Sequence, residues 1–288
     1  MNVALNNVMS GYKIPLGKWV AAGLDWLEHN DYGMLDRIGT VINYSTGLIE
    51  NGLMGLPFWL LALVFIGIGY WRLGWKFALF CAASMLLIDN MGFAEQTVVT
   101  LALIMSATLI SLTLGIPLGI WAGRNDRAES IIRPTLDFMQ TMPAFVYLIP
   151  AAMFFGLGRV PGVIATVIFA MPPVVRLTSL GIRQVNKEQV EAGIAFGCTP
   201  WQLLSKVQLP SAMAALFAGI NQTIMMALSM VIIASMVGAG GLGNDVLSSI
   251  SRLDIGLGFE SGLGVVLLAI MLDRITESFG VKRNTNAL

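Results

Sequence analysis

The sequence predicts an all-α membrane protein whose helices cross the bilayer several times. Hydrophobic residues make up 56% of the 288-residue chain and charged residues only 12%, and the mean hydropathy is +0.75. A soluble domain carries about 25% charged residues, whereas a helix that crosses a bilayer needs roughly 20 consecutive apolar residues. Several runs here have that length. A soluble protein would have to hide all of them inside a small chain, so this alternative is disfavoured.

The first 55 residues mix polar and apolar side chains. In residues 14–30, Trp19 and Trp26 lie among charged neighbours such as Lys18 and Asp25. This pattern is typical of an amphipathic helix at a membrane surface, with tryptophans at the level of the headgroups. A small helix packed on its own protein is the alternative. Residues 36–50 are predicted to form a second such helix.

Hydropathy then predicts about seven transmembrane helices, at 57–71, 74–89, 97–122, 138–157, 161–180, 212–237 and 258–276. The expected organisation is an N-terminal extracytoplasmic or interfacial segment (1–55), a first group of spans (56–94), a core (95–280) and a tail (281–288). Prolines in MPAF (142–145) and MPP (171–173) are expected to bend their helices. The glycines of 238–243 are expected to turn the chain sharply.

Lysines and arginines predict the orientation. In a seven-span topology, four basic regions fall on one side: Arg72 and Lys76; Arg124, Arg127 and Arg133; Arg183, Lys187 and Lys206; Arg274, Lys282 and Arg283. Because short loops rich in these residues stay in the cytoplasm, we expect the N-terminus outside and the C-terminus inside. Residues 181–210 then form a polar cytoplasmic segment, called the insert below.

The insert is predicted to contain two short helices. The first covers residues 188–196, and Gly197 stops it. Thr199 and Gln202 flank Pro200 in the pattern of a capping box, which begins the second helix. Residues 209–210, Leu-Pro, are expected to end that helix. Two helices joined by a tight bend make a stiff unit, which can carry force to a partner.

The insert resembles the permease signature of binding-protein-dependent ABC importers: it has Glu191, Ala192, Gly193, Gly197, Val207, Leu209 and Pro210 at the signature spacings. Two positions depart from it, since Gly193 replaces an alanine and Val207 an isoleucine. From about residue 95 to 280 the chain is similar to permeases of the glycine betaine/proline betaine (quaternary amine, osmoprotectant) group. The segments that carry this include 115–124, 131–150, 171–185, 206–243 and 252–258.

The resemblance implies a type I ABC importer permease fold and transport by alternating access. It implies a homodimeric permease in the bacterial inner membrane, two copies of an ATP-binding subunit and an extracytoplasmic binding protein. ATP and Mg²⁺ would be bound by the partner ATPase, with no cofactor on this chain. The cargo would be glycine betaine, proline betaine, choline or trimethylamine N-oxide. The insert would be the coupling helix, contacting the ATPase through Glu191, Ala192, Gly193, Gly197, Leu209 and Pro210.

The residues themselves argue against other classes. The chain has no Gly-x4-Gly-Lys-Ser/Thr nucleotide loop, no nucleophile–base or metal-ligand constellation, and no net charge to attract nucleic acid. Cys81 and Cys198 are expected to stay unpaired, and His29 is expected to be an ordinary surface residue. The central parts of the last five spans lack charged residues, which disfavours a proton-coupled carrier. A sodium site built from carbonyls and hydroxyls would escape this test.

Polar side chains in the sixth predicted span are candidates for the translocation pathway. Asn221, Gln222 and Ser229 lie in an apolar run, and such groups face other helices or a water-filled path. Interhelical packing is the alternative. For the whole chain, two rival functions remain: an ABC permease for another small solute such as methionine, and an autonomous secondary transporter.

Overall fold

The computed structural model describes residues 15–30 and 33–280, and within these ranges every regular element is helical. The predicted all-α fold is confirmed. The tail 281–288, with Lys282 and Arg283, lies outside the described residues. The elements are α2 (Leu16–His29), α3 (Met34–Met54), α4 (Phe58–Leu73), α5 (Trp75–Asn90), α6 (Ala94–Arg124), α7 (Asp126–Thr141), α8 (Phe145–Phe155), α9 (Arg159–Arg183), α10 (Lys187–Ala195), α11 (Pro200–Leu203), a π-helical turn η1 (Leu204–Gln208), α12 (Leu209–Ala234), a 3-10 turn η2 (Ser235–Val237), α13 (Leu242–Arg252) and α14 (Ile255–Gly280).

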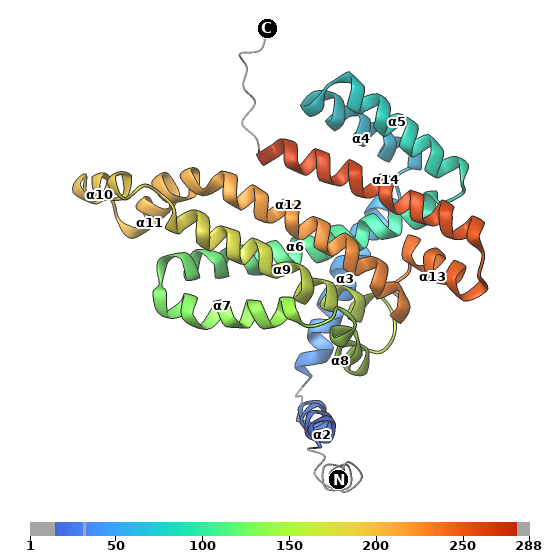
Figure 1. Ribbon diagram of the computed structural model, residues 1–288, viewed down its shortest axis with the longest axis horizontal. Coiled ribbons are helices and arrows are strands. Elements are labelled where there is room, and N and C mark those ends of the chain that lie inside the picture. Colours follow the sequence, from blue (N-terminus) through green and yellow to red (C-terminus); the bar gives the residue numbers. More distant parts are fainter. Residues whose placement is uncertain (1–14, 31–32, 281–288) are drawn as a thin grey trace, which may run out of the picture.

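Helices α6, α9 and α12 form the centre of the molecule and run along its long axis (Figure 1). A row of glycines, Gly115, Gly119 and Gly123, lets α6 approach α9 closely. A Cβ atom added at Gly119 would lie 2.7 Å from the carbonyl oxygen of Val175 and 2.7 Å from Cβ of Thr178. Small residues at four-residue spacing give membrane helices this close approach, so α6 and α9 pack as one rigid pair.

The outer helices are tied to this centre by specific contacts. Arg72, at the end of α4, donates to the carbonyl oxygen of Ser278 and lies 4.5 Å from the centre of the Phe279 ring, which places the α4–α5 turn beside the end of α14. On another side, α3 packs against α6 and α9. Glu50 of α3 is 3% exposed, and Arg159 at the start of α9 pairs with it at 2.5 Å.

Within residues 15–30 and 33–280, four helices are long and apolar enough to cross a membrane: α6, α9, the continuous helix Pro200–Val237 and α14. Up to six spans result if each of two bent helix pairs counts as one. The expected helices at 57–71 and 74–89 are present as α4 and α5, each with 16 residues. The chain is therefore polytopic, with a different span count from the seven that hydropathy suggested.

The expected span at 138–157 is not one helix. The chain bends by 97° between α7 and α8, at the segment that contains Pro143. The sequence predicted a bend at this proline but not two separate helices. By contrast, Pro172 and Pro173 lie inside α9, which continues through both. After the sixth span, Gly238, Gly240 and Gly241 adopt positive φ and turn the chain as expected, but the following helix α13 was not predicted.

The N-terminal region contains the two predicted helices, α2 and a longer α3 than expected. Trp19 and Trp26 of α2 are 62% and 64% exposed. His29 also lies at this surface, with Nδ1 2.9 Å from the carbonyl oxygen of Asp25. The location of α2 at a membrane surface stays a prediction.

Candidate functional site

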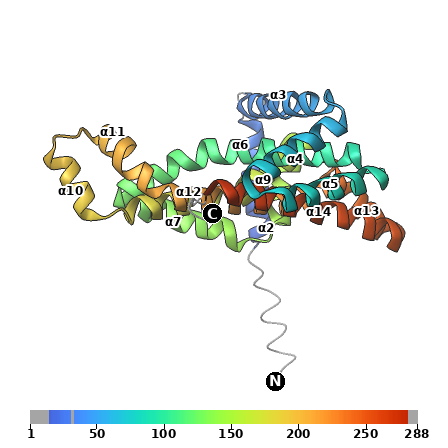
Figure 2. The ribbon, with the colours of Figure 1, turned by 90° about the horizontal axis from the view of Figure 1, so that it is seen from above.

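The insert projects from one end of the helical body (Figures 1 and 2). Its first helix, α10, begins at Lys187 and is capped by Asn186, whose side chain accepts a hydrogen bond from the Glu188 N–H at 2.9 Å. It ends at Ala195, and the predicted stop, Gly197, follows with φ +77°. The Cys198 N–H donates to the Gly193 carbonyl oxygen at 3.0 Å and the Gly197 N–H to that of Ile194 at 2.9 Å. These two bonds form a Schellman motif, which fixes the bend.

The second helix begins with the predicted capping box. The Gln202 N–H donates to Oγ1 of Thr199 at 3.3 Å, and the Thr199 N–H donates to Oε1 of Gln202 at 2.9 Å. The expected end at residues 209–210 is wrong, because the helix runs on through η1 into α12. The Leu209 N–H bonds to the carbonyl oxygen of Leu204, five residues back. This wider π-helical turn immediately precedes Pro210, which lacks an N–H to donate.

The two arms of the insert pack against each other and against the body. Gly193 is buried, and a Cβ atom there would lie 2.8 Å from Cδ1 of Leu203. Below this contact, Leu204 forms a small buried cluster with Ile182 of α9 and Ala212 of α12. The insert is therefore packed against the ends of two central helices.

The outer surface of the insert is apolar at its tip. Glu191 and Ala192 are exposed, as are three large side chains: Ile194 (59%), Phe196 (90%) and Trp201 (71%). Exposed aromatic side chains on a rigid projection are typical of protein interfaces. The family signature did not single out Phe196 or Trp201. Their position beside Gly197 and Pro200, in an otherwise polar segment, is the signal that could have found them.

The structure separates the three predicted pathway residues. Nδ2 of Asn221 donates to Oδ1 of Asp273 at 3.0 Å, and its Oδ1 accepts from the hydroxyl of Thr276, so its amide joins α12 to α14. Gln222 and Ser229 lie on an exposed face of α12 instead. Ala214 and Ala218 precede Gln222 at four-residue spacing on that face. This exposed face therefore carries small and polar residues, with the half-buried Met225 and Met226 between Gln222 and Ser229.

Two of the predicted spans contain a charged side chain, in each case near the end of the molecule that carries the insert. Arg176 lies inside the predicted fifth span and bonds Asp137 of α7 at 2.6 Å. Asp273 lies inside the seventh and contacts Asn221. All of these groups have partners on neighbouring helices. In the described part of the chain, no three His, Cys, Asp or Glu side chains are placed to hold a metal ion, and both cysteines are free thiols.

Comparison with known proteins identifies the family to which this chain belongs. Residues 115–279, which include the insert and the exposed face of α12, match the family described as "Binding-protein-dependent transport system inner membrane component". The chain belongs to this family. These inner membrane components are the permease subunits of ABC importers, as the signature in the insert indicated.

Relatives within this inner-membrane-component family match over most of their length. The chain is 49% identical to the glycine betaine/carnitine transport permease GbuB of Listeria monocytogenes, covering 93% of this chain and 96% of the relative. It is 46% identical to the glycine betaine transport permease OpuAB of Bacillus subtilis, covering 95% and 97%. It is 47% identical to the glycine betaine/proline betaine transport permease ProW of Escherichia coli, covering 93% and 75%.

A solved structure has the same fold. The methionine ABC transporter MetNI in an inward-facing conformation contains a chain that matches with a TM-score of 0.61, covering 65% of this chain and 94% of its own, at 18% identity. The type I ABC importer permease fold is thereby confirmed.

Proposed function

We propose that this chain is the membrane-spanning permease subunit of an ATP-driven importer for glycine betaine or a related quaternary amine. The observation that carries the proposal is the rigid insert with its apolar tip, in a chain 46–49% identical to three glycine betaine permeases. The cargo comes from these relatives. The way in which motion reaches the membrane comes from the geometry of the insert.

In this proposal the ATP-binding subunit holds ATP and Mg²⁺ and grips the tip of the insert. Phe196 and Trp201 are the anchors, while the exposed Glu191 supplies a carboxylate for a charge-assisted hydrogen bond. Gly193, Gly197, Leu209 and Pro210 act indirectly, because they shape the two arms and their junction with α12. The chain itself catalyses no reaction. It changes which side of the membrane its pathway faces.

The complete assembly is proposed to contain two permease copies, two ATP-binding subunits and an extracytoplasmic binding protein. The insert faces the cytoplasm, because Arg124, Arg183 and Lys206 lie in or near it and such residues are retained on that side. The N-terminus then lies outside. The exposed tryptophans of α2 fit a helix at the lipid headgroups.

Gln222 and Ser229 are proposed to line the pathway, on the exposed face of α12, while Asn221 holds α14 in place. In a variant that lacks both native cysteines, Gln222→Cys and Ser229→Cys should react with a hydrophilic maleimide in the assembled complex and then stop uptake. Thr223→Cys is the matched control, since Thr223 is adjacent but 0% exposed. Labelling at Thr223 equal to that at Gln222, or none at either pathway position, would contradict this assignment.

The transport proposal is tested by reconstitution. The chain, its ATP-binding subunit and the binding protein are placed in liposomes, and uptake of radiolabelled glycine betaine is measured with and without ATP. We expect uptake only with ATP and all three proteins, and no competition by methionine. Uptake by the chain alone would identify a secondary transporter, and methionine uptake would change the cargo.

A further inference from the structure

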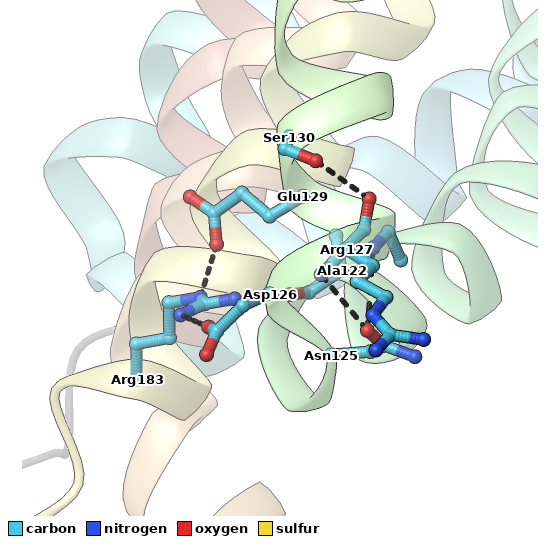
Figure 3. Close-up of polar contacts among 8 residues, drawn as sticks. Ala122, Asn125, Asp126, Arg127, Glu129, Ser130 and Arg183 are labelled. Atoms are coloured by element: carbon cyan, nitrogen blue, oxygen red, sulfur yellow. Dashed lines mark hydrogen bonds and ion pairs between the residues drawn. The ribbon is translucent and has the colours of Figure 1, made fainter.

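One arginine joins three helices next to the insert. Arg183 is the last residue of α9. Its Nη1 lies 2.6 Å from Oδ1 of Asp126, its Nε pairs with the carboxylate of Glu129, and its Nη2 donates to the carbonyl oxygen of Ala122 at 2.7 Å (Figure 3). Ala122 belongs to α6, and the two carboxylates belong to the first turn of α7. A single guanidinium group thus holds the α6–α7 junction against α9.

The same arginine lies at the base of the insert. Only residues 184–186 separate it from α10. That link is fixed at both ends, because the Gln184 N–H bonds to the Leu180 carbonyl oxygen and Asn186 caps α10. Val185 between them is buried. A displacement of α10 therefore reaches Arg183 without slack in the chain.

Helix α7 is attached in a different way from its neighbours. Helices α6 and α9 are in close contact along a row of glycines. Two arginines of α9 instead bond to carboxylates of α7: Arg183 to Asp126 at the start of α7, and Arg176 to Asp137 about three turns further along α7. Asp126 is 92% exposed at its side chain and Asp137 56%. Exposed ion pairs contribute little net stability, so the contacts to Asp126 and Asp137 orient α7 yet can be exchanged at small cost. The pair between Arg183 and Glu129 is more shielded, with side chains 32% and 29% exposed, and keeps the start of α7 beside α9.

The junction between α6 and α7 has the form of a hinge. Asn125 alone separates the two helices, in an extended conformation with φ −137° and ψ 115°. Its side chain accepts from the Arg127 N–H at 2.9 Å and the Ala128 N–H at 3.3 Å, which caps α7 independently of Arg183 (Figure 3). The cap at the start of α7 therefore does not depend on the contacts to Arg183.

We propose that Arg183 is a positioning residue for transport: it transmits the displacement of the insert to α7, so that α7 moves with α9 in each ATP-driven cycle. This rests on the proposed function, since it needs an ATP-binding subunit that moves the insert. The planar guanidinium group reaches three acceptors on two helices at once, and a lysine ammonium group at the same place lacks that fork of donors.

The test measures coupling in the complete reconstituted complex of permease, ATP-binding subunit and binding protein. For Arg183→Gln we expect ATP hydrolysis near the wild-type rate and glycine betaine uptake lowered about tenfold, within the usual range of coupling between sites. Glycine betaine uptake by Arg183→Lys should lie between that of the wild type and that of Arg183→Gln. Arg274→Gln is the matched control, because it breaks another arginine–carboxylate contact, to Glu277, on the exposed side of α14.

The ratio of ATP hydrolysed to substrate imported separates positioning from mere stability. A structural role would lower complex yield and both rates together, leaving the ratio unchanged, and this would overturn the proposal. If Arg183→Gln fails to assemble, the double variant Asp126→Asn/Glu129→Gln removes the two ion pairs from the α7 side, leaves the bond to the Ala122 carbonyl oxygen in place, and must raise the ratio. Failure of the proposed function looks different, because the wild-type complex would then show no ATP-dependent uptake.

Discussion

Replacing Phe196 and Trp201 together with alanine is expected to release the ATP-binding subunit while leaving the membrane helices folded. Both side chains lie at the tip of the insert, 90% and 71% exposed, and neither belongs to the buried cluster beneath it. Buried aromatic anchors of an interface contribute about 2 kcal/mol or more each. Loss of two such anchors therefore predicts affinity lower by about a hundredfold or more.

The measurement is the affinity of purified ATP-binding subunit for the permease in detergent or nanodiscs. A matched control replaces two exposed aromatic residues far from the insert, Trp59 on α4 and Phe259 on α14, with alanine. That pair should leave the affinity unchanged. Wild-type affinity in the Phe196→Ala/Trp201→Ala variant would show that the partner grips another surface.

A methyl group at Gly119 is expected to separate α6 from α9. A Cβ atom would lie 2.7 Å from a backbone oxygen of α9, and a backbone atom cannot rotate away as a side chain does. Overpacking of this kind costs about 1–3 kcal/mol, which outweighs the gain of up to about 1 kcal/mol that alanine brings to a helix over glycine. Gly119→Ala should therefore lower the unfolding temperature and also the uptake.

Gly67 is the matched control for Gly119, because an added methyl group meets no neighbour there. It lies in α4 with no atom within 4 Å of an added Cβ, so Gly67→Ala keeps only the helix gain and should leave the unfolding temperature unchanged or slightly raised. Thermal unfolding of both variants in one detergent compares the two directly. A Gly119→Ala protein as stable as wild type would mean that α6 and α9 are not held at this distance.

Local signals predicted the insert well. Thr199, Gln202 and Gly197 act through hydrogen bonds to residues within a few positions of themselves, so their pattern is legible in the sequence. Hydropathy likewise predicted the four long apolar helices. The polar helix α7 escaped it, because its partners Arg176 and Arg183 lie 39 and 57 residues away along the chain from Asp137 and Asp126.

The sequence also did not show which face of α12 packs against α14 and which face is exposed. Asn221 and Gln222 are adjacent and chemically similar, yet Asn221 bonds to α14 and Gln222 is exposed. That difference depends on Asp273 and Thr276, about fifty residues later. The sequence also predicted a helix end at Pro210, because a proline usually ends a helix. The structure has a π-helical turn before Pro210 instead, and the helix continues through it.

Labelling of Cys198 tests most directly whether the insert is a cytoplasmic handle for an ATP-binding subunit. The chain has two cysteines; Cys81 is 0% exposed in α5, whereas Cys198 is half-buried and lies in the insert, between Phe196 and Trp201 along the sequence. A membrane-impermeant maleimide should label Cys198 in inverted membrane vesicles and not in right-side-out vesicles, and bound ATP-binding subunit should protect it. Labelling from the outside, or no protection by the subunit, would contradict the account.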